Sequence, residues 1–274
     1  MLTTEQKDQF ALEGWLRVPR LISVEEIAAL RDETAGLIAR GHPTRSGDPT
    51  FQYGPAIHDP SRFTFFRVNE LLVVHRLRRI QLLLGHPWLL AAVSDLVGGV
   101  PFAPSTETLL FKLPRQGFGH RWHQDPPAIR RFPSVMAGAY LDPSRAESGA
   151  MRVLPRSHLS GFHGTEDWVF ALTGGPYGKP AEVRVIEAEP GDVVFHATSV
   201  VHGSPWSHAP ELRRTVYFQF DHYEDVRLQA PEFWTRKGYL AGQARLQEAI
   251  TARRAAYPGE TPFPARWVAP EALP

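Results

Sequence analysis

The segment Thr106-Glu-Thr-Leu-Leu-Phe-Lys-Leu113, with the motif Trp122-His-Gln-Asp125 shortly after it, is the most informative part of the sequence. The segment has the composition of a β-strand, and it opens a series of short β-like stretches separated by turns that contain Pro and Gly. No helical pattern alternates with these stretches, so a doubly wound parallel sheet is not expected. We predict a mainly β core, a sandwich or an open barrel, with helices packed outside. The other predicted strands are residues 135–141, 150–154, 182–187, 192–196 and 215–220.

The sequence on either side of this core has helical patterns. Thr3 or Thr4 caps a short helix that ends at Gly14. Ser23 and Glu26 form a capping box for the next helix. We further predict a loop over residues 41–60, a helix from Asn69 to Leu84, a helix opening at Pro87 and a helical tail over residues 231–257. The whole chain, 1–274, is predicted to be one domain, with a helical part at about 1–100, the β core at about 101–225 and a helical tail at about 226–274.

Composition excludes several classes of protein. Hydrophobic residues make up 43% and charged residues 22% of the chain, as in a folded globular protein. The net charge is only +1, which argues against a nucleic-acid binder. There are no cysteines, so disulfides and zinc–thiolate sites are absent. Neither a secretory signal nor an apolar run of about 18 residues is visible, so we expect a cytoplasmic protein without a membrane span.

The motif at 122–125 contains a candidate pair of metal ligands. Near a strand, positions two apart point to the same side, so His123 and Asp125 can offer an imidazole nitrogen and a carboxylate oxygen to one ion. A lone His-x-Asp is a weak motif that arises often by chance. A catalytic metal also needs a third ligand from elsewhere in the chain.

His202 is the favoured third ligand, and His196 is the alternative. His202 follows a predicted strand and precedes Gly203-Ser204, whereas His196 lies within that strand and can be a core or rim residue. Two histidines and one carboxylate form the facial triad of non-haem Fe(II) oxygenases, which leaves positions open for a co-substrate and O₂. The remaining histidines of this half of the chain are expected at the surface; they are His120, His158, His163 and His208.

Basic residues accompany the candidate ligands. Arg213 and Arg214 open the last predicted strand, where they are either exposed or buried beside an anion such as a dicarboxylate co-substrate. Lys112 alternates with Leu110 and Thr108, so it either faces inward to assist a carboxylate or points to solvent.

These residues, in this order, resemble the phytanoyl-CoA dioxygenase family of Fe(II)/2-oxoglutarate oxygenases over nearly the whole chain. The N-terminal helical region is similar, and so is the strand with Lys112 and the motif at 122–125. The segment 147–158, Glu-Ser-Gly-Ala-Met-Arg-Val-Leu-Pro-Arg-Ser-His, resembles the family's turn, although Arg156 stands where the family usually has Gly. His202 and Arg213, eleven positions apart (213 − 202), match the second half of the family's site.

The resemblance implies a double-stranded β-helix, or jelly-roll, core of cupin type. It implies that His123, Asp125 and His202 are the iron ligands and that Arg213 binds the distal carboxylate of 2-oxoglutarate. Ser204, and with less support Lys112 and Thr108, are implied co-substrate contacts. Asp125 keeps the carboxylate that halogenating members of the family lack, so halogenation is not expected.

The expected activity is oxidation of an unactivated C–H bond of a small molecule, with Fe(II), 2-oxoglutarate and O₂. Hydroxylation or oxidative cyclisation in bacterial biosynthesis of an antibiotic or sugar-containing metabolite is favoured. An acyl-CoA hydroxylase of lipid degradation, a non-catalytic cupin-like metal-binding protein and a metal-independent carbohydrate-binding sandwich are alternatives. The sequence does not determine the oligomeric state. Candidate substrate contacts are Tyr53, Trp206, Phe170 and Tyr177.

Overall fold

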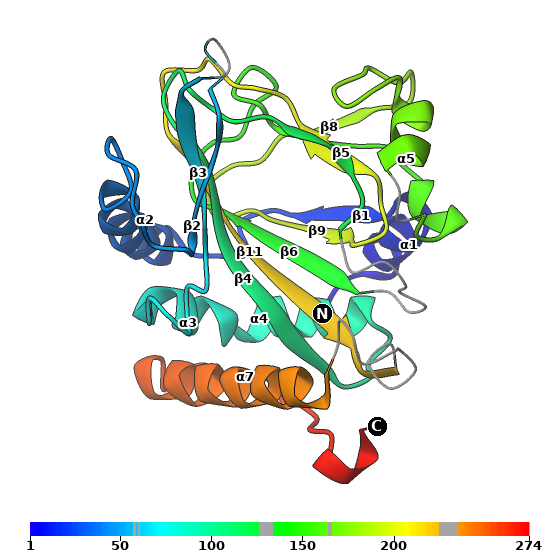
Figure 1. The fold of residues 1–274 in the computed structure, drawn as a ribbon. Coiled ribbons are helices and arrows are strands. Elements are labelled where there is room, and N and C mark those ends of the chain that lie inside the picture. The colour runs from blue at the N-terminus through cyan, green and yellow to red at the C-terminus, as the bar shows by residue number, and fades with distance from the viewer. Residues whose placement is uncertain (57–58, 60, 126–133, 164–165, 225–234, 274) are drawn as a thin grey trace.

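Two antiparallel sheets face each other across the centre of the computed structural model, which describes residues 1–274 except 57–58, 60, 126–133, 164–165, 225–234 and 274 (Figure 1). The large sheet has the strand order β1-β9-β6-β11-β4-β3-β2 and the small sheet the order β5-β10-β7-β8. Helices flank both sheets. The architecture is mainly β with outer helices, and it confirms the expected jelly-roll core.

The strands of the large sheet are β1 (Trp15–Val18), β2 (Phe51–Pro55), β3 (Phe63–Asn69), β4 (Phe102–Lys112), β6 (Val135–Tyr140), β9 (Val193–Ala197) and β11 (Arg213–His222). Those of the small sheet are β5 (His120–His123), β7 (Met151–Val153), β8 (Arg184–Ile186) and β10 (His202–Ser204). The helices are α1 (Thr4–Glu13), α2 (Val24–Ala39), α3 (Arg78–Leu84), α4 (Pro87–Leu96), α5 (Glu166–Thr173) and α7 (Arg236–Ala256), with 3-10 turns at Ser157–Ser160 and Pro270–Ala272.

The six predicted strands are present as β4, β6, β7, β8, β9 and β11. The part predicted to be helical, at about 1–100, contains α1 to α4 and also β1, β2 and β3, which were not predicted and which form the two edges of the large sheet. The helix predicted from Asn69 is wrong: Asn69 ends β3, and the helix begins at Arg78. The start of the helical tail at 231–234 lies outside the described residues, and α7 accounts for the rest.

Local sequence explains where the first helices begin and end. The Thr3 side chain accepts a hydrogen bond from the amide of Gln6, and Gly14 ends α1 in the left-handed conformation with φ of 80°. Ser23 accepts a hydrogen bond from the amide of Glu26 and starts α2. Pro87 occupies the first turn of α4, where its missing N–H is not needed.

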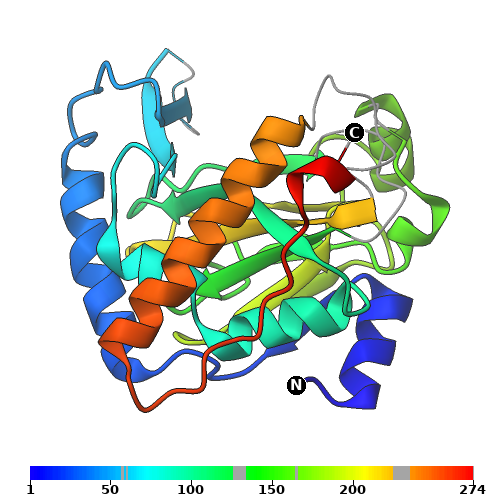
Figure 2. The same cartoon turned by 90° about the horizontal axis from the view of Figure 1, so that it is seen from below.

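Alternation along β4 and β11 gives the large sheet two different faces. Leu109, Phe111, Val216 and Phe218 point outward into the main hydrophobic core. Figure 2 shows α7 and α4 lying across this outer face, and α7 packs directly against β4. The alternate residues point inward to a cavity between the two sheets. None of the helices among the described residues combines the length and the apolar character needed to cross a bilayer.

Candidate metal and co-substrate site

The small sheet brings the two candidate histidine ligands side by side. β10 pairs with β5 so that His202 lies opposite His123, and Asp125 lies two residues after the end of β5. Asp125 Oδ1 lies 3.6 Å from His123 Nε2, and its Oδ2 lies 3.7 Å from His202 Nε2. Two atoms that are each about 2.1 Å from one divalent ion can be up to about 4.2 Å apart. The carboxylate and each imidazole are therefore spaced for shared coordination, and all three ligand atoms lie within 4.8 Å of one another.

Backbone carbonyls fix which ring nitrogen of each histidine faces the others. His123 Nδ1 lies 2.7 Å from the carbonyl oxygen of Arg121, and His202 Nδ1 lies 3.0 Å from that of Val200. A carbonyl oxygen can only accept a hydrogen bond, so in each neutral ring Nδ1 carries the proton. The Nε2 lone pairs are left for a metal, which is the usual way in which an outer hydrogen bond orients a ligating histidine.

His196, the alternative third ligand, contacts Asp125 and is not in the three-residue cluster. Its Nε2 lies 3.3 Å from Asp125 Oδ2. Because a carboxylate oxygen accepts, His196 Nε2 donates its hydrogen here and has no lone pair to offer. The side chain is buried on β9 and its contact orients the Asp125 carboxylate.

Charge interactions at the cluster suit metal binding. Burial opposes ionisation of Asp125, but the nearby His202, His123 and His196 outweigh it and hold the pKa of Asp125 well below its usual range. Burial, reinforced by His123, lowers the pKa of His202 to about 3, so this imidazole is neutral at ordinary pH. Burial also acts to lower the pKa of His123, but the hydrogen bond to Asp125 and its negative charge together outweigh burial and raise this pKa.

Two buried basic side chains lie beyond the cluster, where the ends of β4 and β11 meet. Arg213 is paired in register with Lys112, and both side chains are buried. Arg213 Nη1 donates to Ser144 Oγ and to the carbonyl of Gly149, at 3.0 and 2.8 Å, while its Nε is buried without a partner among the described residues. Lys112 Nζ donates to two backbone carbonyls. Lys112 therefore faces inward, and Arg213 keeps an unused donor.

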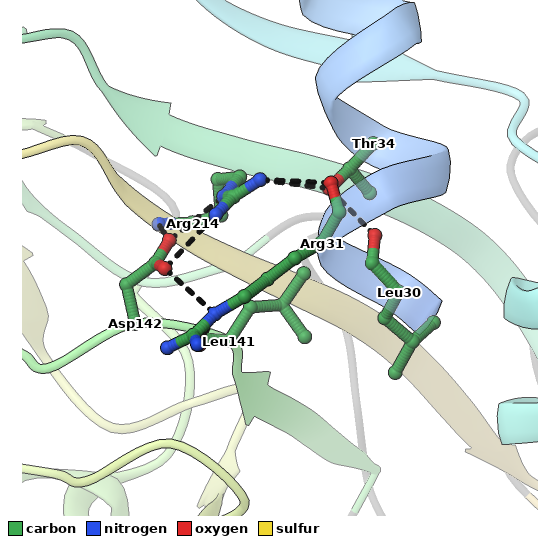
Figure 3. A network of polar contacts seen from close by, with 6 residues as sticks. All are labelled: Leu30, Arg31, Thr34, Leu141, Asp142 and Arg214. Carbon is green, nitrogen blue, oxygen red and sulfur yellow. Dashed lines mark hydrogen bonds and ion pairs between the residues drawn. The ribbon is translucent and has the colours of Figure 1, made fainter. Parts of the chain in front are cut away.

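Arg214 has a different role from its neighbour. It points to the opposite face of β11, where Asp142 accepts from its Nε at 2.8 Å and from its Nη2 at 3.0 Å (Figure 3). Arg214 Nη1 also donates to the carbonyl of Arg31 on α2. Figure 3 shows this network tying α2 to the strands. Of the two arginines that the sequence left open, Arg214 is structural and Arg213 faces the cavity.

The candidate ligands and cations share one cavity of about 220 Å³. Its lining includes most residues predicted for the site; these are Thr108, Lys112, His123, Asp125, His202, Ser204 and Arg213. Burial of Lys112, with Arg213 and Arg152 near it, lowers the Lys112 pKa well below its usual range. This shift disfavours the charged form of Lys112, so Arg213 supplies the positive charge where β4 and β11 meet the small sheet.

The four predicted substrate contacts lie outside the described lining of this cavity. The Tyr53 hydroxyl bonds to the Gly41 carbonyl and the Ser46 amide, so it is committed to the loop at 41–50. Phe170 belongs to the apolar cluster around Trp122, on the face of β5 opposite His123. Trp206 packs against Phe118, and Tyr177 donates to the Gly119 carbonyl, in both cases away from the cavity.

The lining residues that were not predicted include His120 and Arg67. His120, expected at the surface, begins β5 and faces the cavity, where its Nδ1 lies 3.4 Å from Ser204 Oγ. A register shift between His202 and Ser204 puts His120 on the same side as His123 although they are three positions apart, so simple alternation misses it. Arg67 on β3 was missed because that strand itself was not predicted.

The turn at 155–158 accommodates its unusual residue. Arg156 adopts φ of 66°, the left-handed conformation that favours glycine. The turn thus keeps the backbone shape that glycine would adopt, and Arg156 Nη2 contacts Glu182 at 2.9 Å on the surface.

Comparisons with known proteins identify the family of this chain. A family model described as Phytanoyl-CoA dioxygenase (PhyH) matches residues 10–215. The chain belongs to this family. It is therefore an Fe(II)/2-oxoglutarate-dependent oxygenase, and the expected enzyme class and cofactors are confirmed. The non-catalytic and metal-independent alternatives are accordingly wrong. Membership of the family assigns no residue of this chain to a ligand role.

Proteins similar to this oxygenase include a hydroxylase and an epimerase. A methylphosphonate hydroxylase of Gimesia maris is 24% identical over 229 residues, 80% of this chain and 81% of the relative. The crystal structure of AviO1 from Streptomyces viridochromogenes Tue57 has a TM-score of 0.69 at 23% identity, covering 82% of this chain and 98% of that one. The epimerase SnoN in complex with Fe3+, alpha-ketoglutarate and nogalamycin RO has a TM-score of 0.62 at 18% identity, with 81% and 83% covered.

Proposed function

We propose that this oxygenase oxidises an unactivated C–H bond of a small molecule, by hydroxylation or oxidative cyclisation, in the biosynthesis of a specialised metabolite. One observation carries the proposal: a three-ligand cluster and a buried arginine with an unused donor open into the same cavity. Such a cavity can hold a metal and a dicarboxylate together.

In this proposal His123, Asp125 and His202 hold the iron. Arg213 binds the distal carboxylate of 2-oxoglutarate, with Ser204 as a nearby hydroxyl. Iron and 2-oxoglutarate, when bound, activate O₂ and supply the oxidant for the C–H bond. The chain's own contribution is to orient these groups and to exclude water, which strengthens each charge interaction in the cavity.

Lys112 and Thr108 have secondary roles in this proposal. Lys112 Nζ donates to the carbonyls of Phe118 and Pro205, so it fixes the backbone around the Arg213 end of the cavity. Thr108 lies further along β4, opposite Tyr217 of β11. Its hydroxyl donates to Asn69 Oδ1 at 3.2 Å, so a direct contact with 2-oxoglutarate is less favoured for Thr108 than for Ser204.

The cavity supports a compact polar substrate. Hydroxyl, amide and guanidinium groups line it beside Leu110, Met136 and Met151. The cavity of about 220 Å³ must also hold the metal and 2-oxoglutarate, so it leaves little room for a long acyl chain, which disfavours the acyl-CoA alternative. SnoN is named from nogalamycin biosynthesis, and this supports, at the level of the family, a role in making a specialised metabolite.

Succinate formation tests the proposal. Protein reconstituted with Fe(II) should convert 2-oxoglutarate to succinate, and His202→Ala should lose both iron binding and succinate formation. His208→Ala is the matched control, because His208 is exposed and lies outside the described lining of the cavity. If His202→Ala forms succinate at the rate of His208→Ala, the ligand assignment is wrong.

A further inference from the structure

Arg67 is a third basic residue of the cavity, and the proposed function does not use it. It lies on β3, beside Leu110 of β4. Its Nε donates to Asn69 Oδ1 at 2.7 Å, and its Nη2 lies 3.4 Å from Thr108 Oγ1. A guanidinium has five N–H donors in a planar fork. Most of this fork therefore faces the cavity without a partner among the described residues.

No carboxylate of the described chain lies within ion-pair distance of Arg67. Burial lowers the pKa of Arg67, and only the more distant Asp125 raises it. An arginine still remains charged at any ordinary pH. A half-buried charged guanidinium without an acidic partner is costly, and an anionic ligand would offset that cost.

The position of Arg67 separates it from the 2-oxoglutarate end of the cavity. Lys112 and Arg213 are buried at one end of β4, whereas Thr106 is exposed towards the other end. Arg67 reaches Thr108, which is four residues from Lys112, or about 13 Å along a strand. The cavity thus has a closed cationic end and a second cation nearer its mouth.

The charges of the proposed co-substrate are already used. Of the two carboxylates of 2-oxoglutarate, one belongs to the keto acid that chelates the metal and the other meets Arg213. Neither remains for Arg67, which lies nearer to the exposed lining residue Thr106. Gln219 and Thr106 lie opposite each other in register and add amide and hydroxyl groups to this part of the cavity.

We propose that Arg67, braced by Asn69 and Thr108, binds an oxyanion of the substrate, so that the substrate is a small molecule carrying a carboxylate, phosphate or phosphonate. The inference rests on the proposed function and adds the substrate class. A guanidinium binds such groups through two parallel N–H···O bonds, which also fix their orientation. The anion would hold the substrate between the mouth and the metal cluster.

Calorimetry with simple anions tests the inference on protein loaded with Mn(II) and 2-oxoglutarate. The probes are methylphosphonate, propionate and propyl phosphate, with propionamide as the neutral control. We expect at least one anion to bind ten or more times as tightly as propionamide. Comparison of the three anions shows whether the site prefers a phosphonate, a carboxylate or a phosphate group. Wild-type protein that binds no anion better than propionamide overturns the inference.

Arg67→Gln should weaken binding of the preferred anion at least tenfold and leave the affinity for 2-oxoglutarate within about twofold. The affinity of Arg67→Lys for the anion should lie between those of the wild type and of Arg67→Gln, because lysine keeps the positive charge and lacks the planar set of donors. Arg62→Gln is the matched control, since Arg62 is exposed just before β3 and its replacement removes the same charge.

Two results separate this inference from the proposed function. If Arg67→Gln weakens 2-oxoglutarate binding and spares the anion, Arg67 is a co-substrate residue and the inference is wrong. If the wild-type protein forms no succinate and binds no iron, the proposed function fails, whatever the anions do.

Discussion

At the scale of single residues, adjacent arginines have separate tasks. Arg213 keeps an unpaired Nε in the cavity, whereas Arg214 forms a two-pronged pair with Asp142. Removing one partner of a buried charged contact costs about 3 kcal/mol, or about 100-fold in affinity. Arg213→Gln should therefore raise the KM for 2-oxoglutarate by about 100-fold in a succinate assay, with little change in Tm.

Arg214→Gln is the opposite case and serves as the control for that assay. Loss of the Arg214 guanidinium leaves Asp142 buried without its main partner, which costs about 3 to 5 kcal/mol of folding free energy. In a chain of this length the Tm should fall by on the order of 10 °C. The KM should stay near the wild-type value. Equal effects of both substitutions on KM would contradict the separation of roles.

The sequence predicted residues whose positions follow from short-range rules. His123 and Asp125 are two apart at a strand end, and His202 begins a strand. Arg67 and His120 could not be predicted in this way. Arg67 depends on strand β3, which is stabilised by pairing with both β2 and β4, and His120 depends on a register shift between two strands far apart in the sequence.

At the scale of elements, the pairing of β5 with β10 determines the metal cluster. Gly203 lies between the paired positions, and a Cβ atom there would come within 2.9 Å of the carbonyl oxygens of Arg121 and His120. The Arg121 carbonyl also orients His123. Gly203→Ala should therefore displace β5 and weaken iron binding by about 10- to 100-fold, as loss of an outer-sphere contact does.

Competition with a chromogenic iron chelator measures this change. Gly36→Ala is the matched control, because Gly36 is inside α2 and a Cβ atom there meets nothing within 4 Å. It should raise the free energy of unfolding by about 0.4 to 1 kcal/mol and leave iron affinity unchanged. Iron affinity that is the same in Gly203→Ala and Gly36→Ala would show that the strand spacing does not control the cluster.

The elements that the sequence missed have a common physical cause. β1 has four residues, and its partner β9 is about 180 residues away. β2 and β3 form the opposite edge of the same sheet. Such strands are stabilised by contacts with the rest of the sheet and carry little local preference of their own. The central strands β4 and β11 are longer and buried, so their composition alone predicts them.

At the scale of the whole molecule, the large sheet carries the cavity on one face and the helices on the other. Glu107 of β4 points to the helical face, where it is 5% exposed and its Oε1 has no partner among the described residues. Burial raises the pKa of Glu107 from 4.5 to about 7, with Arg245 opposing this and Glu70 adding to it. The folded protein therefore holds this proton more tightly than the unfolded chain does.

Linkage then sets the sign of the pH dependence. The stability that goes with a raised pKa is fully present below pH 4.5 and is lost as the pH rises through about 7. At about 1.4 kcal/mol for each pH unit, the loss amounts to on the order of 3 kcal/mol above pH 7.

Glu107→Gln removes the titrating group, so the free energy of unfolding of this variant should exceed that of the wild type only slightly at pH 5 and most at pH 8. Urea unfolding at both pH values measures the difference. Glu248→Gln is the control, because Glu248 is exposed on α7. A gain for Glu107→Gln that is the same at both pH values would show that Glu107 keeps its charge under α7.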